Sequence, residues 1–352
     1  QGTSCAFIPV MAPFAKVGLG VVFTAAFVGG IFQMWIGRML KPIRHMFPPL
    51  VTGIVVLMIG VSLLKVGFMY AGGGGWLLNN KPEIFGNANH LIIAFTVLIV
   101  ALIAHQKGKG MVSSASILIG MVAGYIVAML MGMINYGKIT SAAWFAMPMP
   151  FQYGIAWDTA AVVLMLFMAI VTTIETIGDI SATTMGGANR EATDKELSGG
   201  IMADGLGTAF GSIFNAMPNT SYSQNAGLVA FTGVISRHVG TVAGVILILL
   251  GLFPKLGGII AAMPESVIGG AAIIMFGLIT AAGIKLISQS QMNQRNILIL
   301  ALSLSFGIGM SLLPQFVAHI PDFGIKLKLL LTTGLIPAGL LAFILNATLP
   351  KK

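Results

Sequence analysis

The chain has 352 residues, of which 57% are apolar and only 8% are charged. A soluble domain has roughly a quarter charged residues, so this composition excludes an ordinary soluble fold. The formal net charge is +9, but the 19 basic residues lie between apolar runs, and a nucleic-acid partner is not expected. One cysteine and five scattered histidines show no metal-ligand spacing, so neither a metal nor a cofactor is expected.

Apolar runs of about 20 residues, the length that a helix needs to cross a bilayer, recur along the whole chain. The pattern predicts twelve segments, at 3–13, 17–37, 48–70, 90–105, 112–133, 159–183, 199–215, 222–235, 239–253, 264–287, 296–313 and 329–349. The segments near Gln1 and Ser221 are too short to cross, and such interrupted segments point to a transporter's binding site. We therefore expect an all-α polytopic protein of the cell (inner) membrane, with the lipid bilayer as its solvent.

The two halves of the sequence resemble each other. A shift of 217 residues places Thr3 and Ser4 on Thr220 and Ser221, and Gly53 on Gly270. In the second half two spans precede the short segment, whereas none precedes the short segment at Gln1. We expect two further spans before Gln1, so that about 12 of 14 spans, arranged as seven plus seven, are present in an N-terminally truncated chain.

If successive spans cross the membrane in alternating directions and 38–47 lies inside, all five arginines fall on the inner side. These are Arg38, Arg44, Arg190, Arg237 and Arg295. Cytoplasmic loops carry an excess of basic residues, so this side is predicted to face the cytoplasm. The other side receives Trp76, Trp144 and Trp157, as expected of rings at a membrane interface.

Three of the ten acidic residues fall at membrane depth. Glu175 and Asp179 are four residues apart and share one helical face, and Asp204 lies in the next span. A charge at mid-bilayer costs about 2.5–3.5 kcal/mol on insertion scales, so such groups normally face an internal cavity. Without a nearby cation they are candidates for proton coupling or substrate contact, and Asp179 and Asp204 also fit a structural role at broken helices.

A polar stretch from Asn215 to Asn225 interrupts the second half. Such a stretch cannot face lipid, and we expect strand-like backbone leading into a half-helix at Gln224, with the Gln1 segment as its counterpart. The amide of Gln224 offers a donor and an acceptor side by side, which matches a purine or pyrimidine edge. Asn225 fits a supporting role, Gly227 allows close helix packing, and Thr232 and Gly233 mark later turns of the half-helix.

The run Gln224-Asn225-Ala226-Gly227-Leu228-Val229-Ala230-Phe231-Thr232-Gly233 matches, at every fixed position, the signature of the nucleobase-ascorbate transporter family. Glu175-Thr176-Ile177-Gly178-Asp179 resembles its acidic motif, and Ala203-Asp204-Gly205 resembles its ninth-span motif. The resemblance covers essentially the whole chain and is closest to bacterial xanthine and urate permeases. It implies fourteen spans in two inverted repeats, two short strands before half-helices, and a homodimer.

The resemblance also implies roles for single residues. Glu175 and Gln224 resemble the family's two side-chain ligands for substrate, and a glutamine at the second position is typical of xanthine and urate carriers. Ser4 resembles a position linked to purine preference, and Cys5, Tyr222 and Ser223 would complete the site. Cys5 stands where many members have phenylalanine. The resemblance also implies that the first two spans, with a histidine that some xanthine permeases carry, belong before Gln1.

These observations predict a carrier for xanthine or urate that works by proton symport, with Na⁺ as a second possible coupling ion. A core (1–47 and 159–253) would rock against a gate (48–133 and 254–352), with 134–158 as an outer loop. A uracil permease of the same family is the nearest alternative. An anion exchanger of the same fold would need a basic central residue, whereas the sequence supplies acids there. An enzyme would need a catalytic constellation that the sequence does not offer, and a channel would show flux without saturation.

Overall fold

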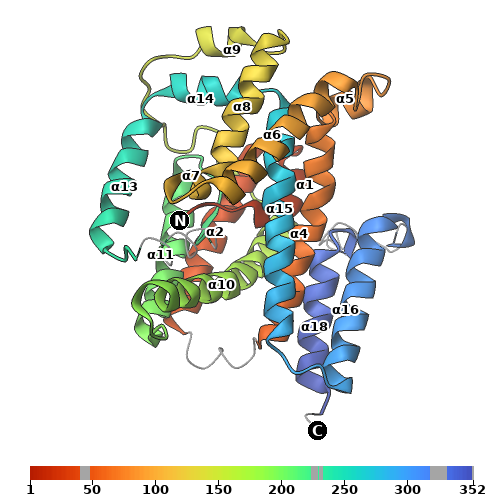
Figure 1. Ribbon diagram of the computed structural model, residues 1–352. Helices are drawn as coiled ribbons and strands as arrows, with labels where there is room; N and C mark the ends of the chain where they lie inside the picture. The colour runs from red at the N-terminus through yellow and green to blue at the C-terminus, as the bar shows by residue number, and fades with distance from the viewer. Residues whose placement is uncertain (40–47, 223–228, 230–232, 318–330, 351–352) are drawn as a thin grey trace. The chain divides into compact units, whose positions relative to one another are not determined.

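The computed structural model describes residues 1–39, 48–222, 229, 233–317 and 331–350, and within them the fold is almost entirely helical (Figure 1). The chain forms two compact units. Unit 1 comprises Gln1–Ser62, Met149–Gly233 and Ile279–Lys352, and unit 2 comprises Leu63–Pro148 and Val234–Leu278. Two long helices, α4 (Pro49–Ala71) and α15 (Glu265–Ser288), contribute residues to both units.

Unit 1 contains the two short strands that the described residues form. The strands are β1 (Gly2–Thr3) and β2 (Asn219–Thr220). The helices that lie wholly in unit 1 are η1 (Cys5–Phe7), α1 (Ile8–Ala15), α2 (Leu19–Arg38), α10 (Thr159–Ala188), α11 (Asp194–Ile213), α16 (Gln294–Leu312), η3 (Pro314–Val317) and α18 (Leu335–Thr348). β1 and β2 pair antiparallel, with Gly2 opposite Thr220 and Thr3 opposite Asn219. The strands therefore join the beginning of the chain to a segment more than 200 residues away.

Helices α2 and α11 cross closely because both present glycine at the contact. A Cβ on Gly30 would lie 2.6 Å from the Ala209 nitrogen, and one on Gly205 would lie 2.6 Å from the Met34 nitrogen. Small residues allow membrane helices to approach in this way when no hydrophobic force drives them together. Helix α2 also contacts α10, where a Cβ on Gly29 would meet the Met165 side chain. Helices α2, α10 and α11 therefore pack together within unit 1.

Side chains fix the ends of α10 and α11. Asp158 accepts hydrogen bonds from the Ala160 and Ala161 amides at the start of α10, and Asn189 ends that helix in a left-handed conformation with φ 51°. Thr193 and Glu196 form a reciprocal capping box at the start of α11. Hydrogen bonds from the Arg190 guanidinium and from Thr193 hold the pKa of Glu196 below its usual range.

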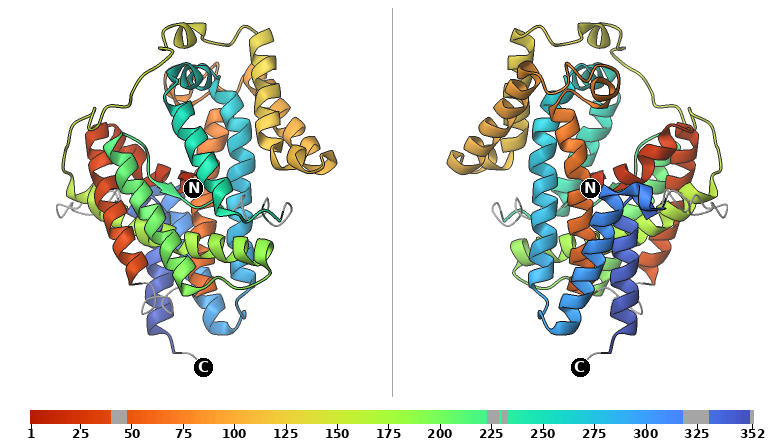
Figure 2. Two further views of the ribbon diagram at one scale, coloured as in Figure 1. Left: turned by 90° about the vertical axis from the view of Figure 1, so that its left-hand side faces the viewer. Right: turned by 90° about the vertical axis from the view of Figure 1, so that its right-hand side faces the viewer.

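Unit 2 is also built of helices. Besides its parts of α4 and α15 it contains α5 (Gly75–Asn80), α6 (Ala88–Lys107), α7 (Met111–Ser114), α8 (Ser116–Leu130), α9 (Tyr136–Thr140), α13 (Arg237–Gly251) and α14 (Pro254–Ala261). Helices α6 and α8 pack along each other, and both views of Figure 2 show them together in orange and yellow. α13 and α14 meet at an 80° bend. Pro254, at the start of α14, cannot continue the preceding helix.

The expected helices lie close to where the hydropathy pattern put them. Segment 48–70 corresponds to α4 and segment 264–287 to α15, each within one residue. Among the described residues six helices are long and apolar enough to cross a membrane, and the bent pair α13 and α14 would make a seventh. Helices α8 and α18 are apolar but shorter. The number of spans in the whole protein stays a prediction.

Candidate substrate site

Asp204 is the centre of a buried polar network in unit 1. Its side chain is fully buried, and Oδ2 accepts a hydrogen bond from the Thr176 hydroxyl at 2.5 Å. The same oxygen accepts from the Ser221 amide at 3.3 Å and from the Ser221 hydroxyl at 3.2 Å. A buried carboxylate is costly unless donors surround it, so these three bonds tie α11, α10 and the residue after β2 to one atom.

Thr208, one helical turn after Asp204, fixes β2 itself. Its hydroxyl lies 2.8 Å from the side-chain oxygen Oδ1 of Asn219 and accepts a hydrogen bond from the Asn219 backbone N–H at 3.1 Å. On the other strand, the Ser4 amide donates to the Pro218 carbonyl at 3.0 Å. The Tyr222 hydroxyl donates to the Thr3 carbonyl at 2.6 Å. Strands of two residues are not stable alone, and these bonds explain how so short a pair persists.

The three intramembrane acids gather in this region. Glu175 and Asp179 lie on α10 on either side of Thr176, whose hydroxyl bonds to Asp204. The Oε2 atom of Glu175 is buried and has no hydrogen-bond partner within the described residues. Buried polar atoms are nearly always bonded, so an exception of this kind marks a place where a ligand or a proton can bind.

A cavity of about 240 Å³ opens beside Asp179, within unit 1. It is lined by Gln1, Asp179, Ile180, Thr183, Thr184, Ser221 and Tyr222. Most of these side chains are polar, although α10 is an apolar helix over most of its length. The cavity can therefore offer hydrogen bonds to a small polar molecule, with Asp179 and Tyr222 among the residues that the sequence singled out.

The remaining predicted site residues fall into two groups. Ser4 is buried, and its hydroxyl accepts from the Ala6 amide at 3.2 Å, which caps the turn after β1. Cys5 begins η1, and Gly233 has φ 66°, a left-handed conformation that favours glycine. Five residues lie outside the described ones: Ser223, Gln224, Asn225, Gly227 and Thr232. The predicted face-to-face arrangement of Glu175 and Gln224 thus stays a prediction.

Sequence reasoning did not single out Thr176 and Thr208, which anchor the network. Three other threonines of α10, Thr172, Thr173 and Thr184, donate to carbonyls of their own helix, as threonines in apolar helices commonly do. Residue type alone does not separate the two roles. The position of Thr176 beside Glu175 was the available signal.

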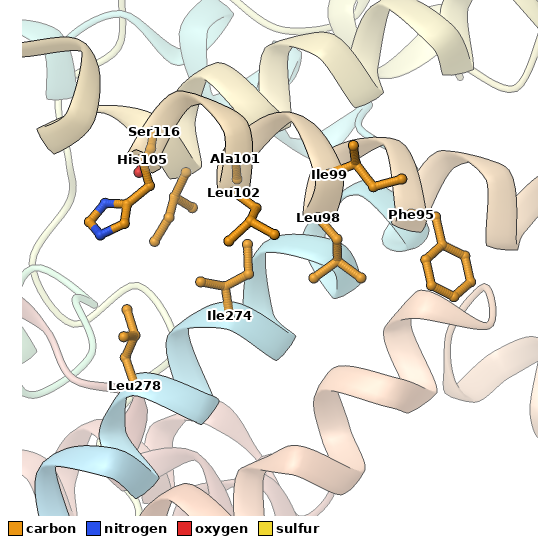
Figure 3. A pocket seen from close by; sticks show the side chains of 10 residues that line it. Phe95, Leu98, Ile99, Ala101, Leu102, His105, Ser116, Ile274 and Leu278 are labelled. Carbon is orange, nitrogen blue, oxygen red and sulfur yellow. The ribbon is translucent and has the colours of Figure 1, made fainter. Parts of the chain in front are cut away.

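Unit 2 contains a larger groove of about 390 Å³, formed by α6, α8 and α15 (Figure 3). Its lining is almost entirely apolar, with Phe95, Leu98, Leu102, Ile274 and Leu278 among the side chains that Figure 3 shows. Only His105 and Ser116 add polar atoms. A site for a polar substrate needs several convergent polar groups, so the cavity beside Asp179 is the better candidate. No group of side chains suited to a metal ion occurs in the described residues.

Comparison with known proteins identifies the family of the chain. A sequence model named Xan_ur_permease, described as "Permease family", matches residues 1–316. The chain belongs to this permease family. Permeases are transporters, so the protein is a multi-pass membrane transporter and not an enzyme, as the sequence predicted.

Two bacterial permeases are similar along nearly the whole chain. The xanthine permease XanP of Escherichia coli (strain K12) is 35% identical over 366 residues, covering 100% of this chain and 78% of XanP. The uric acid permease PucJ of Bacillus subtilis (strain 168) is 34% identical over 343 residues, covering 97% of this chain and 76% of PucJ. This permease thus spans about three quarters of the length of both relatives.

The fold of this permease is also found among solved structures. The transmembrane domain of a cyanobacterium bicarbonate transporter, BicA, aligns with a TM-score of 0.53 and 15% sequence identity. The alignment covers 97% of this chain and 80% of BicA. At this identity the likeness concerns the fold alone.

Proposed function

We propose that this permease carries a nucleobase, xanthine or urate, across the cell membrane by proton symport with alternating access. The observation that carries the proposal is the convergence of three intramembrane acids with the paired strands β1 and β2 inside unit 1. Relatives named for xanthine and uric acid support the choice of a purine. The chain makes and breaks no bond in the substrate.

In this proposal Glu175 accepts hydrogen bonds from the ring N–H groups of the nucleobase. Its Oε2 atom has no partner within the described residues, so binding a donor there satisfies a group that is otherwise costly to bury. Gln224 reads the purine edge through its amide, with Ser4, Cys5, Ser223 and Tyr222 around it. Gly227, Thr232 and Gly233 shape the half-helix that follows.

Asp204, Asp179 and Asn225 support the site and the proton coupling. Asp204 holds Ser221 in place, so a change in its protonation would alter the backbone that leads into the substrate segment. Asp179 borders the cavity directly and lies one helical turn from Glu175. A proton taken up by this group of acids would link substrate binding to the proton gradient.

The proposed cycle uses fourteen spans in two inverted repeats, in a homodimer. A core (1–47 and 159–253) rocks against a gate (48–133 and 254–352), which exposes the site to one side of the membrane at a time. The likeness to BicA in fold supports this cycle.

Uptake of radiolabelled purine tests the proposal directly. The protein, expressed from its complete gene in cells that lack purine uptake, should accumulate labelled xanthine or urate and lose that accumulation when a proton uncoupler is added. Unlabelled xanthine and urate should compete strongly and uracil weakly. Accumulation that persists with the uncoupler would remove the proton coupling, and preferential competition by uracil would favour the uracil permease.

A further inference from the structure

Gln33 is a buried amide in the middle of α2 that the proposed mechanism does not use. Its side chain is 1% exposed, and its Nε2 atom has no hydrogen-bond partner within the described residues. Leaving a buried donor unpaired costs about 1–3 kcal/mol. An amide retained at such a position therefore calls for a partner.

The helix register places Gln33 opposite Asp204. On α2, Gly30 and Gly37 lie three residues before and four residues after Gln33, so all three share one face. Gly30 packs on Gly205 and Ala209, and Gly37 packs on Ile201 and Met202. The two helices thus run in opposite directions, and Gln33 falls at the level between these contacts, where α11 carries Asp204.

Gln33 also lies close to the contact between α2 and α10. It follows Gly29 by one turn, and Gly29 packs against Met165 of α10. The Thr176 hydroxyl of α10 donates its hydrogen bond to Asp204 of α11 where these two helices pack together. Gln33 and Asp204 are therefore both buried where α2, α10 and α11 pack together.

Asp204 has a matching unsatisfied atom. Thr176 and Ser221 donate to Oδ2, whereas Oδ1 is buried and has no partner within the described residues. A donor and an acceptor that both lack partners, enclosed by the same three helices, form a pair that a water molecule can link. Buried waters typically make about three hydrogen bonds to groups of this kind.

We infer that Gln33 is a positioning residue for Asp204, with its side-chain amide linked through one enclosed water molecule to Oδ1. The link fixes the carboxylate from the side of α2, while Thr176 and Ser221 fix it from α10 and β2. Helices α2, α10 and α11 then all hold Asp204, the carboxylate to which Ser221 is hydrogen-bonded. The effect on transport rests on the proposed function, whereas the link itself does not.

Thermal unfolding of the purified protein tests the link without any substrate. Gln33→Leu should lower the unfolding midpoint by about 2–4 °C, because the carboxylate oxygen loses its donor in a closed space. If the amide had no partner, leucine would remove an unsatisfied group and the midpoint would rise. Ser303→Ala is the matched control, since Ser303 is fully buried and its Oγ has no partner within the described residues. This control should leave the midpoint unchanged or raise it.

The same substitution in the Asp204→Ala background identifies the partner. In that background Gln33→Leu should no longer lower the unfolding midpoint, because the Asp204 oxygen that the Gln33 amide is linked to is already gone. An equal decrease in both backgrounds would overturn the inference, and so would an increase in the parental protein. If Asp204→Ala yields no folded protein, the sign of the shift in the parental background still decides.

Transport kinetics separate positioning from a general loss of stability. Gln33→Leu should raise the KM for labelled xanthine by about 3- to 10-fold, the range of one hydrogen bond, with little change in maximal uptake per folded molecule. Gln33→Glu, which keeps the length and a polar end, should recover part of the affinity. An unchanged KM in Gln33→Leu would overturn the positioning role. A parental protein that does not take up xanthine would count against the proposed function and would leave the thermal test intact.

Discussion

Replacing Thr176 by valine removes a hydroxyl at the centre of the network. Valine has nearly the shape of threonine, and the hydroxyl that is lost donates to Asp204 Oδ2 at 2.5 Å and lies 3.4 Å from the Thr220 hydroxyl. Thr173 is the matched control on the same helix. The two side chains are 0% and 2% exposed, and the Thr173 hydroxyl donates only to the Ala169 carbonyl, within its own helix.

The expected difference follows from the partners. A hydrogen bond to a charged group contributes about 1.5–3 kcal/mol, whereas a threonine bonded back to its own helix contributes little. Thr176→Val should therefore lower the free energy of unfolding by about 1–2 kcal/mol more than Thr173→Val does. Equilibrium unfolding of both purified variants in mixed micelles measures the difference. Equal losses would refute the view that Thr176 holds Asp204.

Two further predictions concern the frame of unit 1. Gly30→Ala should lower the free energy of unfolding by about 1–3 kcal/mol, because the added Cβ would overlap the backbone of α11. The control Gly199→Ala should not lower it, since a Cβ at Gly199 meets open space. Equal unfolding free energies of the two variants would contradict the close crossing of α2 and α11. Arg295 donates hydrogen bonds to the carbonyls of Asn346 and Leu349, so Arg295→Lys should speed amide hydrogen exchange at 346–349 about fivefold. The control Arg237→Lys should leave this exchange unchanged, since Arg237 is exposed. Unchanged exchange in Arg295→Lys would contradict the anchoring of 346–349 by Arg295.

The sequence predicted the positions of the long helices well, because the thickness of a bilayer dictates the length of an apolar run. Segments 48–70 and 264–287 match α4 and α15 within one residue. The strand pair was also expected in outline, since a polar stretch inside a membrane protein must satisfy its own backbone. What the pattern could not give is which partner β2 takes, because pairing with β1 depends on residues more than 200 positions away.

Side-chain partners inside the helices were harder to predict. Thr176 and Thr173 look alike in the sequence, yet one bonds to Asp204 and the other to its own helix. The difference arises from the rotation of α10 against α11, which depends on close packing at glycines and not on hydropathy. Gln33 did carry a signal, as a lone amide in an apolar span, and its meaning depends on the same packing.

The bend between α13 and α14 shows another limit. The predicted segments 239–253 and 264–287 leave 254–263 without a helix, whereas the structure has a separate helix, Pro254–Ala261, at 80° to the one before it. Hydropathy reports burial in lipid and carries no information on the direction of a short helix. Proline at the first turn was the one local sign that a new helix could begin there.

Equilibrium binding of labelled xanthine to the Glu175→Gln variant tests the central claim most directly. Glutamine keeps the shape of the side chain but removes the charge that would accept N–H groups of the purine. The affinity should fall about 10- to 100-fold, as expected for loss of a charge-assisted hydrogen bond, while Glu83→Gln, in an exposed loop, should bind as the parent does. An affinity for xanthine that is unchanged in Glu175→Gln would contradict the account.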